Sequence, residues 1–227
     1  MSYNIRSLRD DRHAVARVIR AVDPDVLCIQ EAPRFLCWRH KCRWLARATG
    51  LRIASGGRVA AANMIMVRPG IEVQAARSVL FTKDPRLHQR GLAMALLNTA
   101  DHRLVAAGTH LDGWPEPRLR HVRELFAALD AFVPNAVPFA LAGDFNDDPG
   151  SAVWDALSER GADVFAAVGA GAGFTLNVTE PTRRIDGVFA SPGLRPRTAT
   201  ALDSPDVRIA SDHRPFVTDL ELGVALG

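Results

Sequence analysis

The 227-residue sequence contains little cysteine and no long apolar run. Its three cysteines, Cys28, Cys37 and Cys42, cannot form a complete set of disulfides, and their spacing matches no common zinc-binding pattern. No stretch approaches the ~18 apolar residues that a membrane-spanning helix requires, and the first residues lack the apolar segment of a secretory signal. These absences exclude a disulfide-rich scaffold and predict reduced thiols in a cytoplasmic protein without a membrane span. A longer natural N-terminus stays open, because the first predicted strand begins close to Met1.

The composition is that of an ordinary folded protein. Hydrophobic residues make up 48% of the chain and charged residues 23%, and no repeat, low-complexity tract or linker divides it. We therefore expect one domain spanning residues 1–227, and a monomer. The formal net charge of +3 favours anionic ligands without the dense Lys/Arg face of a dedicated DNA-binding protein. Phosphate-bearing substrates fit this charge, and so does an unspecialised basic surface.

Hydrophobic periodicity predicts alternating helices and strands. Helical patterns begin at Arg12 and run to Val22, cover Arg34–Ala48 with Phe35 on the buried side, extend from Leu119 to Leu129, and follow a capping Ser151. Short apolar runs predict strands at Val26–Ile29, Val59–Val67, Ile71–Phe81, Leu92–Asn98, Arg103–Gly108, Phe139–Ala142, Arg184–Ala190, Arg197–Leu202 and Phe216–Leu220. Strands in both halves, interleaved with helices, predict a layered α/β domain built around extensive sheet.

Polar residues with reactive side chains follow several of these strands. They are Asn4, Glu31, His110, Asp144, Asn146, Asp212 and His213. Each alone is explained about as well by a turn or an exposed strand end. Together they form a set of carboxylate and amide oxygens without a Cys/His cluster, which suits Mg²⁺ or Mn²⁺ and not zinc. Such an ion polarises phosphoryl oxygens, so the set points to phosphate chemistry.

Six sequence runs resemble the endonuclease/exonuclease/phosphatase superfamily, in that family's order. The runs are SYNIR from Ser2, PDVLCIQE from Pro24, GTHL from Gly108, LAGDFN from Leu141, RIDGVF from Arg184 and SDHRP from Ser211. The resemblance spans residues 2 to 215, and the combined set is specific although each run alone is not. It implies an α/β fold, a four-layered α/β sandwich with two packed β-sheets flanked by helices.

The resemblance also implies a role for each site residue. Asn4, Glu31 and Asp212 would hold Mg²⁺ or Mn²⁺, with Glu31 as the principal ligand. His110 would contact the scissile phosphate, Asp144 would position or deprotonate the attacking water, and Asn146 would orient this assembly. His213 would donate to a phosphoryl oxygen or transfer a proton. Asp186 would fix its ring, since a carboxylate partner selects the tautomer and favours the imidazolium.

The function stays open between three alternatives. A phosphodiesterase or nuclease-like hydrolase, with nucleic acid as a possible partner, is the first. A phosphatase or phospholipase-type enzyme acting on lipid, inositol or small-molecule phosphates is the second, because the loops between Glu31 and His110 look short and carry no basic or aromatic insertion. A non-catalytic binding module on the same fold is the third. Trp114, soon after His110, is a candidate for the mouth of the cleft.

Other polar residues are weaker candidates. Asn63 is as compatible with structural support as with a site role, and Arg90 and Thr175 carry less weight still. Five histidines belong to no constellation, so we expect them to be exposed or locally bonded: His13, His40, His88, His102 and His121.

Overall fold

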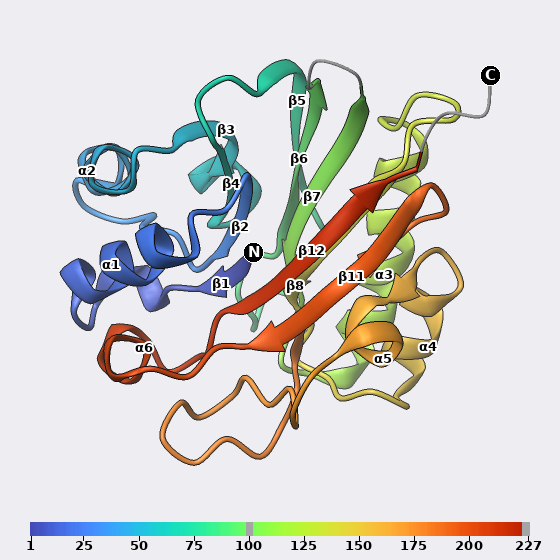
Figure 1. Cartoon of the computed structure of the whole chain (residues 1–227). Helices are drawn as coiled ribbons and strands as arrows, with labels where there is room; N and C mark the ends of the chain where they lie inside the picture. Colours follow the sequence, from blue (N-terminus) through green and yellow to red (C-terminus); the bar gives the residue numbers. More distant parts are fainter. Residues whose placement is uncertain (99–101, 224–227) are drawn as a thin grey trace.

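The computed structural model describes residues 1–98 and 102–223 as two six-stranded sheets packed face to face with helices outside (Figure 1). The first sheet has the order β11-β12-β1-β2-β4-β3 and the second the order β5-β6-β7-β8-β10-β9. Helices α1, α2 and α6 cover one side, and α3 and α4 cover the other. The predicted four-layered α/β sandwich is thereby confirmed. None of the helices within the described ranges is long and apolar enough to cross a membrane.

The strands of the first sheet come from both ends of the chain. They are β1 (Ser2–Asn4), β2 (Val26–Gln30), β3 (Arg52–Gly57), β4 (Asn63–Val67), β11 (Leu194–Ala201) and β12 (Phe216–Leu222). The second sheet uses the middle of the chain, with β5 (Glu72–Leu80), β6 (Gly91–Asn98), β7 (Arg103–His110), β8 (Phe139–Asp144), β9 (Ala162–Asp163) and β10 (Asp186–Ala190). The helices are α1 (Arg12–Val22), α2 (Trp38–Thr49), α3 (Pro115–Asp130), α4 (Ala152–Ser158), α5 (Val164–Val168) and α6 (Pro205–Ala210).

Local sequence signals explain where α1 and α4 begin and end. The Asp11 carboxylate caps α1 by accepting hydrogen bonds from the backbone N–H groups of His13 and Ala14, and Ser151 caps α4 in the same way. Helix α1 ends at Asp23, which adopts a left-handed conformation before Pro24.

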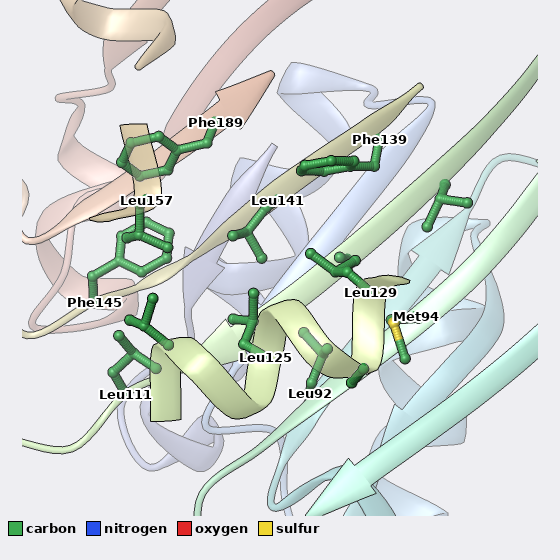
Figure 2. Packing of buried hydrophobic residues seen from close by; sticks show 14 of the residues in the cluster. Leu92, Met94, Leu111, Leu125, Leu129, Phe139, Leu141, Phe145, Leu157 and Phe189 are labelled. Atoms are coloured by element: carbon green, nitrogen blue, oxygen red, sulfur yellow. The ribbon is translucent and has the colours of Figure 1, made fainter. Parts of the chain in front are cut away.

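Three buried clusters fill the three interfaces between the four layers. Helices α3 and α4 pack on the second sheet, and Figure 2 shows Leu125 and Leu129 of α3 beside Leu141 of β8. A second cluster lies between the first sheet and the helices α1, α2 and α6. The cluster between the sheets is rich in small residues such as Ala93, Ala95 and Ala106, so the two sheets approach closely. The packed sandwich is a rigid support for the residues at its edges.

The register of the second sheet aligns three of the predicted site residues. His110 of β7 pairs with Asp144 of the parallel strand β8, and Asp144 pairs with Asp186 of the antiparallel strand β10. These three residues therefore occupy one row across the sheet. In the first sheet, β1 and β2 run parallel, with Asn4 beside Gln30. Glu31 follows directly.

Several predicted elements were wrong in detail. Helix α2 begins at Trp38 and not at Arg34, and Phe35 is 68% exposed instead of buried, because the chain after Glu31 leaves the sheet in a loop. The predicted strand at Val59–Val67 is confined to β4, since Arg58–Ala60 forms a 3₁₀ turn. Strands β3 and β9 and helices α5 and α6 were missed. The single domain over residues 1–227 stays a prediction, and residues 99–101 and 224–227 lie outside the described part.

Candidate active site

Asp144 is the centre of a group of polar side chains at one edge of the sandwich. Its Oδ2 atom lies 3.0 Å from Asn4 Nδ2, 3.3 Å from His110 Nε2 and 3.7 Å from His213 Nε2. Its Oδ1 atom accepts a hydrogen bond from the backbone N–H of Asn146. Asp144 itself is 1% exposed. The carboxylate is thus fixed by contacts from both of its oxygens, which is the arrangement that a water-positioning group requires.

A carboxylate holds His213 through the ring nitrogen that faces away from Asp144. Its Nδ1 atom lies 2.8 Å from Asp186 Oδ2, while its backbone N–H donates to Ser211 Oγ. Asp186 is anchored in turn, because its backbone N–H donates to the buried hydroxyl of Thr175. The pair predicted from the sequence is therefore formed, and Thr175 supports it through the backbone.

The two histidines beside Asp144 differ in charge. Burial lowers the pKa of His110 to about 3, outweighing the opposite effect of Asp144. Burial also lowers the pKa of His213, but the charges of Asp186 and Asp144 together raise it to about 10. At neutral pH His110 is consequently neutral and His213 is a cation. One imidazole can contribute hydrogen bonds only, whereas the other also supplies positive charge and a proton.

Asn146 fixes the loop that follows Asp144. Its Nδ2 atom lies 3.0 Å from His110 Nε2 and donates to the carbonyl of Leu111. Its backbone has φ 54°, a left-handed conformation that asparagine tolerates better than most residues. Arg118 of α3 donates to the Asn146 carbonyl and completes the support.

Asn4 and Glu31 come from the ends of neighbouring strands in the first sheet. The Asn4 Nδ2 atom lies 3.4 Å from Glu31 Oε1 and donates to Asp144, so one amide joins two carboxylates. The Asn4 Oδ1 atom accepts from the backbone N–H of Arg6. In this arrangement Asn4 positions the carboxylates, and its oxygen would reach a metal only after rotation of the amide. Its ligand role stays a prediction.

Asp212 lies at the open side of the group. Its side chain is 46% exposed and forms an ion pair with Arg6 at 3.3 Å. Ser211 links it to the first strand, since Ser211 Oγ donates to the Asn4 carbonyl and contacts Asp212 Oδ1 at 3.3 Å. Asp212 thus adjoins Asn4 from the solvent side.

The side chains present fit a hard divalent cation. Asp144, Asp186 and His213 can bring one ligand atom each within 4.8 Å of one another. In that trio, however, His213 Nδ1 and Asp186 Oδ2 already contact each other at 2.8 Å. Glu31 and Asp212 carry partly exposed carboxylates, and carboxylate oxygens are the preferred ligands of Mg²⁺ and Mn²⁺. Their roles as metal ligands stay predictions.

Two arginines lie near the site; the sequence offered Arg90 only as a weak candidate and did not assign Arg34. The Arg90 side chain is largely buried, and its Nε atom lies 3.7 Å from Asp112 Oδ2. Burial lowers the pKa of Arg90, while the carboxylates of Asp144, Asp112 and Glu31 counteract this effect. The charge of Arg34 lowers the pKa of both Arg90 and His110. No local motif marks either residue. The only available signal was that Arg90 is a positively charged residue at the start of a buried strand.

The hydrogen bonds of the remaining weaker candidates support the fold. Asn63 is fully buried and donates to the carbonyls of Ala60 and Gly91, which is structural support. His121 is 2% exposed, and its Nε2 atom lies 3.1 Å from the carbonyl of Thr82. The expectation of an exposed or locally bonded His121 was therefore wrong, because α3 turns this residue toward the second sheet.

The sequence profile of the endonuclease/exonuclease/phosphatase family matches residues 1–213. The chain belongs to this family, whose members hydrolyse phosphate esters and generally depend on a divalent metal. No curated protein matches the sequence significantly.

Solved structures share the fold at low identity. A mannosyl-6-phosphatase from Bacteroides thetaiotaomicron has a TM-score of 0.82 at 19% identity, covering 97% of this chain and 98% of its own. TDP2 from D. rerio, solved with a single-stranded DNA product, has a TM-score of 0.76 at 19% identity, covering 97% of both chains. A family protein from Bacteroides vulgatus has a TM-score of 0.83 at 18% identity, again covering 97% of both. At these identities the likeness shows the fold alone.

Proposed function

We propose that this chain is a metal-dependent hydrolase in which Asp144 directs a water molecule at the phosphorus of a phosphate ester. A carboxylate contacted by Asn4 and by the Asn146 backbone is held in one orientation, so it can accept a hydrogen bond from the nucleophilic water and take up its proton. The attack would form the new P–O bond while the bond to the leaving alcohol breaks.

The two imidazoles would divide the remaining work. His213 is cationic, so it would stabilise charge on the phosphoryl group and donate a proton, while Asp186 keeps its ring oriented. His110 is neutral, so it would contribute a hydrogen bond to a phosphoryl oxygen. The convergence of Asn4, His110 and His213 on one oxygen of the Asp144 carboxylate is the observation that best supports the proposal.

Glu31 and Asp212 would hold the divalent cation, with Asn4 orienting the Glu31 carboxylate. A bound Mg²⁺ or Mn²⁺ would supply Lewis acidity and neutralise charge on the phosphoryl oxygens. Arg90 and Arg34 would add positive charge at the same edge of the site.

The proposal is tested with bis(p-nitrophenyl) phosphate as a diester and p-nitrophenyl phosphate as a monoester. We expect release of p-nitrophenol with Mg²⁺ or Mn²⁺, its loss with a chelator, and its recovery when metal is restored. His213→Ala should remove most of the turnover, whereas the exposed-loop variant Asp148→Asn should retain it. Hydrolysis that is indifferent to chelation, or a near wild-type rate in His213→Ala, would contradict the proposal.

A further inference from the structure

Exposed apolar side chains gather in the loops around the candidate active site. Eight large apolar residues are exposed in the described part of the chain, and five of them lie in segments that are linked to the site through the sequence or through hydrogen bonds. We call these five the apolar rim; they are Phe35, Leu36, Val59, Trp114 and Phe174. Exposed apolar residues scattered singly need no explanation, but a concentration beside one site marks a place where a ligand is covered.

The first part of the rim belongs to the loop after Glu31. Phe35 and Leu36 are 68% and 86% exposed. The Arg34 guanidinium lies 5.1 Å from the centre of the Phe35 ring, and its charge lowers the pKa of His110. Apolar surface and positive charge therefore occur side by side in this loop, next to the proposed phosphate site.

The second part is the turn that holds Val59, which is 61% exposed. This turn is tied to the first loop by the hydrogen bond from the Ala32 backbone N–H to the Ala62 carbonyl. It is also tied to the start of β6, because Asn63 donates to the carbonyls of both Ala60 and Gly91. Val59 thus stands between the loop after Glu31 and the strand that follows Arg90.

Trp114 and Phe174 extend the rim to the second sheet. Trp114 is 62% exposed, and its backbone N–H donates to Asp112, whose carboxylate faces Arg90. Phe174 is 37% exposed and precedes Thr175, the residue that anchors Asp186. Segments from both sheets that carry exposed apolar residues are consequently linked to the same polar centre.

We propose that the apolar rim binds the alcohol part of a small phosphate ester and that this part is an apolar, ring-bearing group. The inference rests on the proposed function. The chemistry is complementary, because Arg34 and Arg90 match the phosphate charge while the rim matches an uncharged ring. Aromatic faces such as Phe35 and Trp114 stack on rings.

The test compares 2-naphthyl phosphate with phenyl phosphate. Both release an aryl alcohol of similar chemistry, but the naphthyl group offers more apolar area. We expect a higher kcat/KM for the naphthyl ester in the wild type. Phe35→Ser and Trp114→Ser should each reduce this preference by about tenfold, which is the scale of a small change in apolar contact. Ile53→Ser is the matched control, since Ile53 is 41% exposed on β3 and pairs with Met66, away from the site.

The outcomes separate the inference from the proposed function. If the wild type hydrolyses neither these monoesters nor bis(p-nitrophenyl) phosphate with Mg²⁺ or Mn²⁺, the proposed function fails. If it hydrolyses the diester but neither monoester, the inference of a small monoester substrate is overturned and the proposed function stands. If it hydrolyses both monoesters at rates whose ratio is unchanged in Phe35→Ser and Trp114→Ser, only the role of the rim is overturned. Equal unfolding temperatures of the variants would show that their folds are intact. A further outcome would also overturn the inference. If the wild type binds phosphatidylcholine vesicles strongly, both variants abolish this binding, and the wild type shows no preference between the soluble esters, the rim binds a membrane surface instead.

Discussion

The two sheets contribute different chemistry to the candidate active site. The first sheet and its loops supply Glu31 and Asp212, carboxylates that are half exposed and suited to a hard cation. The second sheet supplies His110, Asp144 and Asp186, which are buried and aligned in one row. Solvent access favours exchange of a hydrated ion, whereas burial lowers the pKa of His110 and keeps its imidazole neutral. The layered fold thus keeps these two environments apart within one site.

Two contacts join the environments across the gap between the sheets. Asn4 at the end of β1 donates to Asp144 at the end of β8. His213, from the loop before β12, bonds Asp186 of β10 and approaches Asp144 at 3.7 Å. Each contact links a residue of the first sheet's segments to one of the second sheet. The site is therefore complete only when the sandwich is packed.

The largest expected effect comes from the buried row. Asp144→Asn keeps the shape of the side chain but removes its charge and basicity, so kcat should fall by about 10²- to 10⁴-fold, the range of general acid–base catalysis. Steady-state kinetics on bis(p-nitrophenyl) phosphate would measure the loss. Asp148→Asn, in the following loop, is the control. Near wild-type turnover in Asp144→Asn would remove Asp144 from the centre of the mechanism.

The half-exposed carboxylates should instead control metal affinity. Glu31→Gln should raise the Mg²⁺ or Mn²⁺ concentration needed for half-maximal activity by at least about 10- to 100-fold. This is the loss of metal affinity that is typical when a residue that supports a metal ligand is mutated. Isothermal titration calorimetry with Mn²⁺ alone should likewise show weaker Mn²⁺ binding by Glu31→Gln than by the wild type, without relying on turnover. Unchanged Mn²⁺ binding in Glu31→Gln would mean that the ion lies elsewhere.

A pH profile separates the roles of the two histidines. The pKa of His213 is raised from its ordinary value of 6.5 to about 10. The stability that the charged ring contributes is therefore fully present below pH 6.5 and is lost as the pH rises through about 10. Activity should decline along the same alkaline limb. Asp186→Asn removes a charge that raises this pKa, so the limb should move to lower pH by on the order of one unit. A limb that stays in place would show that another group titrates there.

The smallest expected effect is at a buried residue of β1 that the proposed mechanism does not use. Tyr3 is fully buried and its hydroxyl has no hydrogen-bond partner. Tyr3→Phe removes an unsatisfied polar atom, so the free energy of unfolding should rise by about 1 kcal/mol while kcat stays unchanged. Urea denaturation measures the first quantity. A decrease in stability would indicate that the hydroxyl is satisfied in solution.

Much of the fold was predictable because hydrophobic periodicity is local. The stripe of α1 reflects a helix packed on one face, and the apolar runs of β2, β7 and β8 reflect strands buried on both faces. The errors fell where periodicity is absent, as in the loop after Glu31, where Phe35 is exposed. Short elements such as α6 and β9 also escaped, since two to six residues carry too little pattern.

The sequence by itself determined the kinds of reactive groups and their positions at strand ends, because motif residues and strand patterns are properties of short segments. The predicted Asp186 partner already implied a charged His213, whereas only the tertiary structure decided that His110 is neutral, since its burial arises from packing. The same is true of Arg34 and Arg90, whose charges act on the site across the two sheets. Interactions between segments far apart in the chain have no local signature, so they become visible only when the layers are assembled.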